Sequence, residues 1–154
     1  MLTQKVVLSQ CELLNRYYDE RALSSLPTNG TSPYFQFGDL EWGFDLIQDI
    51  EGKPSCMPIP LDKKTIKNVF YRSKANYAYV NGNIVITANL PAGTLAEDEQ
   101  HQFSCVGVKD ASGGLILVAV TQPVWIYSDR GLSIEIVINT ARTDSARVAQ
   151  VGAQ

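Results

Sequence analysis

The chain has 154 residues, of which 45% are hydrophobic and 19% are charged, the size and composition of one globular domain with its own core. Its net charge of −3 provides no basic surface for neutralising phosphates, so we expect no nucleic-acid partner. No apolar run approaches the ~18 residues of a membrane span and no secretory signal pattern opens the chain, so we expect no membrane partner and synthesis in a cytoplasm. The densest basic group, Lys63, Lys64 and Lys67, is typical of a solvated turn or strand edge.

The first element along the chain is predicted to be a helix over residues 10–24. Ser9 is followed three residues later by Glu12, the spacing of a capping box, in which each side chain satisfies a backbone N–H of the other residue. Leu8 and Leu13 have the spacing of a hydrophobic staple across the same helix start. These two signals together predict that the helix begins at about Gln10.

The next segment is rich in turn-forming residues. Residues 26–33 are predicted to be a loop, and residues 34–37 a short strand that ends at Gly38-Asp39. Residues 40–62 contain several prolines and glycines, which disfavour central strands and helix interiors. We therefore expect an irregular, ordered loop there, with room for one helical turn.

From residue 66 the pattern becomes that of β-structure. Alternating apolar residues lead into Asn81-Gly82, a dipeptide that adopts the positive φ values of a type I′ turn at little cost. The residues after it alternate again from 84 to 90. This pattern predicts a β-hairpin, the clearest structural signal in the sequence.

Three further strands are predicted at 103–109, 115–121 and 132–139, joined by turns at 110–114 and 128–131. The fold class is therefore α+β and mostly β, with the N-terminal helix packed on an antiparallel sheet or sandwich of short strands. We expect residues 1–140 to form a single domain and residues 141–154 to be a tail that is flexible or ordered by a partner.

Residues that could carry catalysis or bind a metal are sparse. His101 is the only histidine and lies in a polar, exposed-looking stretch, so a triad would depend on it. Cys11, Cys56 and Cys105 are odd in number and widely spaced, which favours reduced, small apolar residues over disulfides or a zinc site. The acidic run at 97–99 is interpreted as a solvated loop. We expect no catalytic residues, no cofactor and no metal.

The aromatic residues suggest an interaction surface. Tyr77 and Tyr79 alternate with the strand period and are predicted to lie in the core. Trp42 and Trp125 lie in loop-like surroundings, where they could belong to the core or could stack on sugars or line an interface. The residues that we select as candidate interface residues are Phe35, Phe37, Trp42, Trp125 and Tyr127.

Five elements follow one another along the chain: the helix at 10–24, the Gly38-Asp39 step, the segment Val69-Phe70-Tyr71-Arg72, the hairpin at 106–120 and the alternating strand at 132–139. The hairpin turns at Asp110-Ala111-Ser112-Gly113-Gly114. In this order, over residues 8–140, the five elements resemble the N-terminal attachment domain of bacteriophage tail-collar fibre proteins.

This resemblance implies a structural role and no reaction. Domains of this family anchor a fibre to the tail or baseplate and typically assemble as trimers. The chain is therefore expected to be a virion component in the phage tail, assembled in the host cytoplasm. Its expected partners are copies of itself as a homotrimer, other tail or baseplate proteins, and a tail fibre for which it is an attachment module or adaptor.

Two other functions remain open from the sequence. A carbohydrate- or receptor-binding module of the tail would present an exposed aromatic shelf at Trp42 or Trp125. An enzyme such as a small glycan hydrolase would bring two carboxylates together in space, although no pair stands out among the 16 acidic residues.

Overall fold

The computed structural model describes residues 2–5, 8–27 and 35–140. The predicted tail at 141–154 and most of the predicted loop at 26–33 lie outside these residues. The elements in chain order are β1 (Leu2–Lys5), β2 (Gln10–Leu13), α1 (Asn15–Ser24), β3 (Phe37–Gly43), β4 (Ile47–Ile50), β5 (Lys53–Cys56), β6 (Tyr71–Ser73), β7 (Asn76–Val80), β8 (Asn83–Leu90), β9 (Gln100–Asp110), β10 (Leu115–Tyr127) and β11 (Arg130–Asn139).

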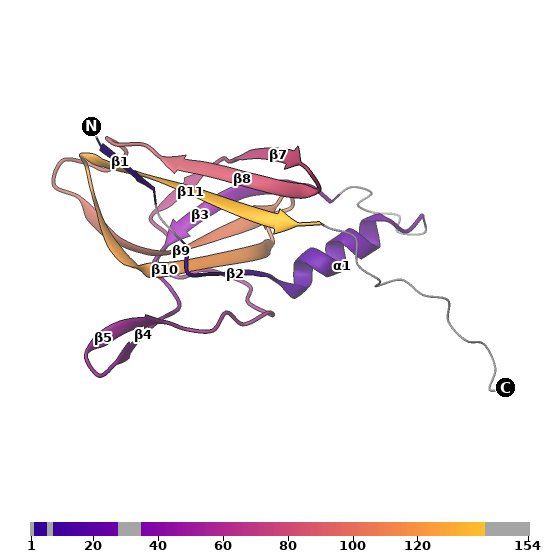
Figure 1. Ribbon diagram of the computed structural model, residues 1–154, viewed down its shortest axis with the longest axis horizontal. Coiled ribbons are helices and arrows are strands. Elements are labelled where there is room, and N and C mark those ends of the chain that lie inside the picture. The colour runs from indigo at the N-terminus through magenta and orange to yellow at the C-terminus, as the bar shows by residue number, and fades with distance from the viewer. Residues whose placement is uncertain (1, 6–7, 28–34, 141–154) are drawn as a thin grey trace.

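Two mainly antiparallel sheets pack face to face as a sandwich (Figure 1). The first, sheet A, has the strand order β1-β11-β8-β7, and the second, sheet B, has the order β2-β10-β9-β3-β6. Apolar side chains from the facing sides of both sheets form the main core, because alternate residues of each strand point inward. This confirms the predicted mostly β fold with one N-terminal helix.

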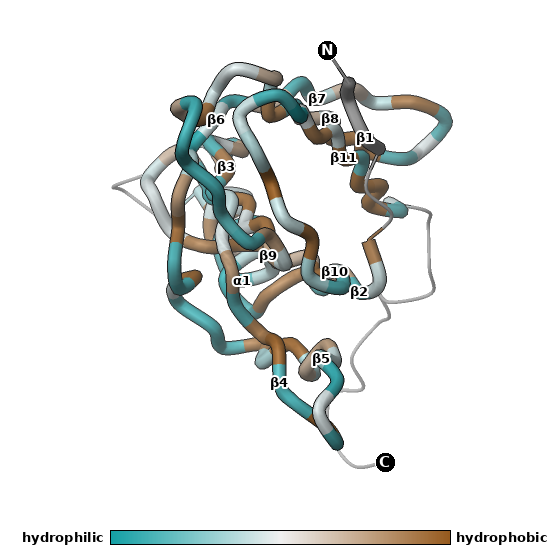
Figure 2. Tube along the Cα trace, turned by 90° about the vertical axis from the view of Figure 1, so that its left-hand side faces the viewer, coloured by the Kyte–Doolittle hydropathy of each residue, from teal (hydrophilic) through white to brown (hydrophobic). Residues whose placement is uncertain are grey.

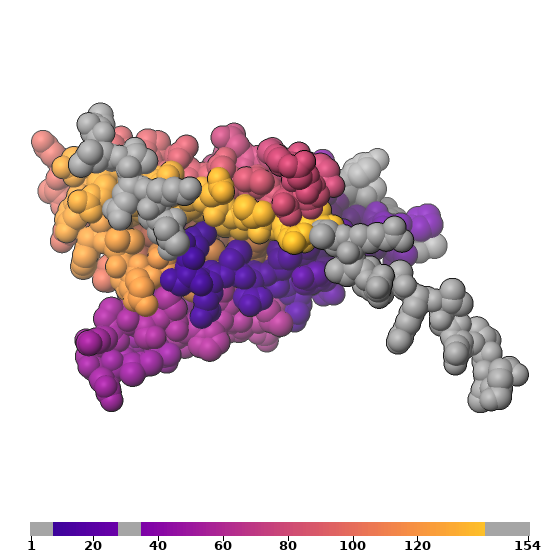
Figure 3. Space-filling view, in the orientation of Figure 1, coloured from indigo at the N-terminus to yellow at the C-terminus, as the bar shows by residue number. Residues whose placement is uncertain are grey.

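A third layer covers the far side of sheet B. The β4–β5 hairpin and the segment at 57–69 lie there. The hairpin is at the bottom of Figure 2 and projects from the body at the lower left of Figure 3. Leu46, Ile59 and Ile66 from this layer pack with Cys105 and Val118 of the central strands in a second apolar cluster. The central strands β9 and β10 are therefore buried on both faces.

The N-terminal residues cover one edge of each sheet. β1 runs parallel to β11, and β2 then pairs antiparallel with residues 117–120 of β10. An uncovered strand edge presents unpaired N–H and C=O groups, so this segment satisfies edges of both sheets in succession.

The predicted start of the helix is wrong. Residues 10–13 form β2, and the helix begins only at Asn15, preceded by Leu14 with no side-chain cap. The backbone N–H of Ser9 donates to the carbonyl of Val120 at 2.8 Å, so the capping box with Glu12 does not form. The reason is tertiary: the open edge of β10 offers hydrogen-bond partners to the whole segment, whereas a cap satisfies only two donors.

The strand predicted at 34–37 is also misplaced, since β3 begins at Phe37 and continues through Gly38-Asp39 to Gly43. Gly38 lies inside the strand and allows the close approach of the neighbouring backbone, because a Cβ there would lie only 2.5 Å from the carbonyl oxygen of Asp110. The strand thus needs a glycine for close approach, where the sequence pattern indicated a strand end.

The loop predicted at 40–62 contains the β4–β5 hairpin instead of a helical turn. Glu51 and Gly52 form its turn with positive φ values of 53° and 79°. Glutamate is uncommon at a positive φ, so the pair Glu51-Gly52 does not have the sequence pattern by which such a turn is predicted. Pro54 is tolerated because each strand of a two-stranded sheet has one unpaired edge.

The remaining β predictions are confirmed. β7 and β8 form the hairpin around Asn81 and Gly82, whose φ values are 50° and 82°. The strands predicted at 103–109, 115–121 and 132–139 lie within β9, β10 and β11, which are longer than predicted.

The corrected N-terminus can be tested with Ser9→Ala. A helix N-cap would lose about 1 kcal/mol of stability on this change. Because Ser9 is exposed and its backbone makes the hydrogen bond, we expect the free energy of unfolding to change by less than about 0.5 kcal/mol. Urea denaturation followed by circular dichroism measures this, and a loss near 1 kcal/mol would argue for the cap.

Candidate functional site

Two large aromatic side chains are exposed together at the end of β10. Trp125 and Tyr127 are 45% and 40% exposed, and they lie two residues apart on the same face of the strand. Their cross-strand partners on β9 are Gln102 and Gln100. These four residues form a surface that we call the aromatic platform.

An irregularity in β10 decides that the platform faces outward. The pairing of β10 with β9 shifts register between Val120 and Val124, and Pro123 lies within the shift. Before it, Val120 packs in the outer cluster, and after it, Val124 and Ile126 pack against the main core. Since a slip of one residue exchanges the faces of a strand, the shift turns Trp125 out of the core.

The platform is chemically neutral except at one end. The guanidinium of Arg130 lies 5.8 Å from the ring centroid of Tyr127, within the range of a cation–π contact. Aromatic faces offer apolar contact area, and the amides of Gln100 and Gln102 both donate and accept hydrogen bonds. Such a surface can hold a sugar ring or a flat patch of another protein. The sequence analysis identified the two aromatic residues but missed the glutamines, because their position depends on strand register.

The other candidate interface residues are engaged inside the protein. Trp42 is fully buried, and its Nε1 donates to Ser73 Oγ at 2.9 Å, so its assignment to an interface is wrong. Phe35 and Phe37 are half-buried, with ring centroids 5.6 and 6.3 Å from that of Tyr17 on α1. These two residues connect the helix to the sandwich.

The two tyrosines expected in the core differ. Tyr77 packs against the main core, stacks on Phe37 at 5.0 Å and donates to the carbonyl of Gly38 at 2.6 Å. Burial and the nearby Asp39 raise the pKa of Tyr77 to about 12. Tyr79 is 73% exposed, so its assignment to the core is wrong. It lies near the end of β7, opposite Ile84 of β8.

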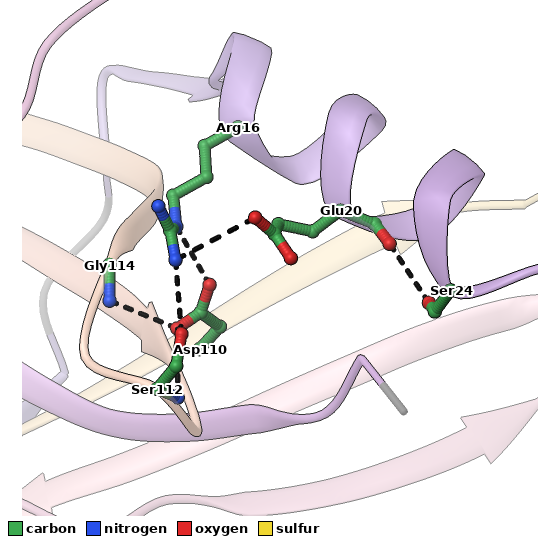
Figure 4. Close-up of polar contacts among 6 residues, drawn as sticks. All are labelled: Arg16, Glu20, Ser24, Asp110, Ser112 and Gly114. Carbon is green, nitrogen blue, oxygen red and sulfur yellow. Dashed lines mark hydrogen bonds and ion pairs between the residues drawn. The ribbon is translucent and has the colours of Figure 1, made fainter. Parts of the chain in front are cut away.

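Asp110 ties the helix to the β9–β10 turn (Figure 4). One carboxylate oxygen accepts hydrogen bonds from the backbone N–H groups of Ser112 and Gly114, and the other accepts one from Arg16 Nε at 2.8 Å. Burial raises the pKa of Asp110, but the hydrogen bonds of Ser112, Arg16 and Gly114 outweigh it and hold the pKa below its ordinary value. This turn is thus a hairpin turn, as expected, with its carboxylate fully engaged.

A charged depression of about 510 Å³ lies beside this turn. Asp110 and a second buried carboxylate, Glu41, line it, and Glu41 Oε2 accepts from Arg72 Nε at 2.9 Å and from Lys109 Nζ at 3.3 Å. Lys74 and Asp39 form a more exposed ion pair at 3.3 Å on its rim. These pairs connect β3 with β6 and β9. Because the opposite charges are paired with each other, the depression offers little net charge to a ligand.

One lysine of the basic group is not solvated as expected. Lys63 forms an ion pair with Asp45 at 2.9 Å, and the two side chains are only 13% and 10% exposed. Burial raises the pKa of Asp45, but hydrogen bonds from Lys63 and from the N–H groups of Lys67 and Leu46 outweigh it and lower the pKa. The pair fastens the third layer to sheet B.

His101 lies at the start of β9. It is partly exposed, its ring stacks on Phe70 at 4.9 Å, and its Nε2 lies 2.9 Å from Glu99 Oε2. The three cysteines are free, and burial raises the pKa of the Cys105 thiol to about 12. Among residues 2–5, 8–27 and 35–140, no group of three or more acidic, histidine or cysteine side chains could hold a metal ion.

Comparison with known proteins gives no relatives. No protein-family model, no curated protein and no solved structure matches the chain significantly. In the part of the chain that the structure describes, no helix is both long enough and apolar enough to cross a membrane.

The role of Asp110 can be tested with Asp110→Asn, which removes the charge and keeps the shape. We expect the free energy of unfolding to fall by about 2 kcal/mol at pH 7, because the charge-assisted hydrogen bond from Arg16 is lost. The pKa of Asp110 is lower in the folded state, so its stabilisation is present at neutral pH and is lost as the pH falls below about 4.

Urea denaturation of the unaltered chain and of Asp110→Asn at pH 7 and pH 3 measures this dependence. The difference between their free energies of unfolding must be smaller at pH 3 than at pH 7. Asp19→Asn is the control, since Asp19 is an exposed acid on α1, the helix that Asp110 binds, and we expect it to cost less than about 0.5 kcal/mol. An equal difference at both pH values would contradict the assignment.

Proposed function

We propose that the protein is a structural component of a bacteriophage tail that attaches or adapts a tail fibre to the tail or baseplate. It acts by binding, as a trimer assembled in the host cytoplasm, and performs no reaction. The observation that carries the proposal is that the elements on which the family resemblance rests meet in space, although they lie far apart in the sequence.

The contacts among these elements are specific. Arg16 of the helix binds Asp110 of the later hairpin, and Gly38 of the Gly-Asp step packs against the carbonyl of the same residue. Arg72 of the segment Val69-Phe70-Tyr71-Arg72 binds Glu41, three residues after that glycine. A Cβ on Gly114 would lie 1.8 Å from Arg16 Nε, so the turn and the helix require each other. The elements therefore form one structural unit, which supports the resemblance over a set of chance matches.

Exposed apolar residues on the surface also support a binding role. Two exposed apolar groups are the aromatic platform and Ile50, which is 51% exposed on the β4–β5 hairpin that projects from the body (Figure 3). Exposed apolar residues of this kind favour contacts with other proteins. The charged side chains of the depression are paired internally, which suits a stable scaffold.

The decisive experiment is to look for the chain in particles of the phage that encodes it. We expect mass spectrometry of purified particles to detect it, and gold-labelled antibodies to mark the tail in electron micrographs. Purified, infectious particles that lack the chain would refute the proposal.

The proposed trimer gives a separate expectation. One chain has a mass of 17.0 kDa, so a trimer has three times 17.0 kDa, or 51 kDa. Size-exclusion chromatography with light scattering should give 51 kDa over a tenfold range of concentration. A constant mass of 17.0 kDa would contradict the trimer while leaving the location in the particle to the experiment above.

The aromatic platform favours a second candidate, binding of neutral carbohydrate by the tail. If it is correct, Trp125→Ala should weaken binding of a neutral polysaccharide about tenfold, roughly 1.4 kcal/mol, because the ring supplies the stacking face. Tyr79→Ala is the control, since Tyr79 is 73% exposed elsewhere. Titration calorimetry against a panel of neutral glycans measures this, and no binding across the panel would exclude the candidate.

A further inference from the structure

β4 has an outer edge whose backbone groups the hairpin does not use. β4 and β5 form a sheet to which no third strand of the described residues is added. β5 is the strand nearer the body, since it lies beside β10 and its Cys56 packs against the second apolar cluster. Residues 48–50 of β4 are exposed. β4 is therefore the outer strand of an arm that projects from the body (Figure 3).

The hydrogen-bond pattern of the hairpin decides which groups point outward. Opposite residues of an antiparallel pair alternate between pairs that exchange hydrogen bonds and pairs that do not. The two-residue turn places Ile50 in a bonded pair. At the other end the carbonyl of Leu46 accepts from the N–H of Met57 at 2.8 Å, in the same alternation. Ile47 and Asp49 between them therefore direct their N–H and C=O groups away from β5.

The two strands of the hairpin differ in how their edges are protected. The outward groups of β4 have no partner in the part of the chain that the structure describes. Unpaired edges of this kind pair with other chains, and proteins commonly block them with proline or lysine. β5 carries both, as Lys53 and Pro54, and Pro54 lies opposite Asp49. β4 carries neither, so its edge is left able to pair.

The backbone of β4 selects the conformation of its partner. N–H and C=O groups that point outward at every second residue are matched by a second extended strand, which is the geometry of strand addition. The side chain of Ile50, which is 51% exposed, offers an apolar contact to such a strand. The occupant of this edge is thus an extended segment.

The side chains of the arm select the charge of that segment. Asp49 is exposed, and Glu51 in the turn beside it is exposed as well. Neither carboxylate forms an ion pair with any residue in the ranges 2–5, 8–27 and 35–140. A lysine or arginine opposite Asp49 on an added strand is attracted to it, whereas an acidic residue is repelled. The β4 strand of a second copy would add to the negative charge, so a different, basic segment fits this edge better.

We propose that β4 binds an extended segment of another protein by adding it to the β4–β5 sheet as a third strand. The segment carries a basic residue opposite Asp49 and, next to it, an apolar residue opposite Ile50. Backbone hydrogen bonds to Ile47 and Asp49 hold the segment, and the basic residue distinguishes it from acidic segments. The inference goes beyond the proposed function, because the edge pairs with such a segment whatever assembly contains the chain.

The test uses a short peptide of alternating valine and lysine, blocked at both ends, as the probe. NMR titration of the unaltered chain follows each backbone amide. We expect the amide signals of Ile47 and Asp49 to shift and their hydrogen exchange to slow. The same peptide with glutamate in place of lysine should bind about tenfold more weakly. Shifts confined to another strand edge, or equal binding of the two peptides, would overturn the inference.

Asp49→Pro tests the edge itself. Proline removes the outward N–H of residue 49 and no hydrogen bond within the hairpin, because Asp49 and Pro54 form a pair that exchanges none. The variant should keep its fold by circular dichroism and bind the lysine peptide about tenfold more weakly, and unchanged binding would contradict the proposal. Asp49→Asn keeps the N–H and should reduce the preference for the lysine peptide. Asp98→Asn, at an exposed acid before β9, is the matched control and should keep that preference.

Hydrogen exchange of the unaltered chain without peptide distinguishes a second copy from another protein. The amides of Ile47 and Asp49 should exchange quickly at every protein concentration. Protection that rises with concentration would show that a second copy occupies the edge, and would overturn the assignment to another protein. These results do not bear on the presence of the chain in phage particles, so the proposed function is decided separately.

Discussion

The burial of β9 and β10 on both faces is the constraint on which the rest of the structure depends. One face packs against sheet A and the other against the third layer. Two strands buried in this way cannot leave their backbone groups unpaired, so both outer edges of this pair need partner strands. β2 supplies one and β3 the other. The conversion of a predicted helix start into β2 follows directly from this requirement.

Buried carboxylates attach neighbouring elements to one another, and two of them involve β9 directly: Asp110 is its last residue, and Glu41 pairs with its Lys109. Asp110 binds the helix through Arg16, Glu41 binds Arg72 of β6, and Asp45 binds Lys63 of the third layer. A buried charge is costly unless it is paired and hydrogen-bonded, so each of these elements is held in one position. The ion pairs thus specify the arrangement of the elements, while apolar burial supplies most of the stabilisation.

Charge is unevenly distributed over the surface. Charged residues concentrate on the helix, the acidic loop and the depression, where many are paired with each other. The aromatic platform has one charged group in contact with it, the Arg130 guanidinium at the ring of Tyr127.

The sequence by itself determined the fold class, the β7–β8 hairpin and the central strands, because hydrophobic alternation and the Asn81-Gly82 turn are local signals. It also identified Trp125 and Tyr127 of the platform. Only the tertiary structure decided the rest: that residues 10–13 pair as a strand, that Trp42 is buried and Trp125 exposed, and that Gln100 and Gln102 join the platform. These features depend on edges, register and a shift within β10. Such properties arise between segments distant in sequence, so no pattern within one segment contains them.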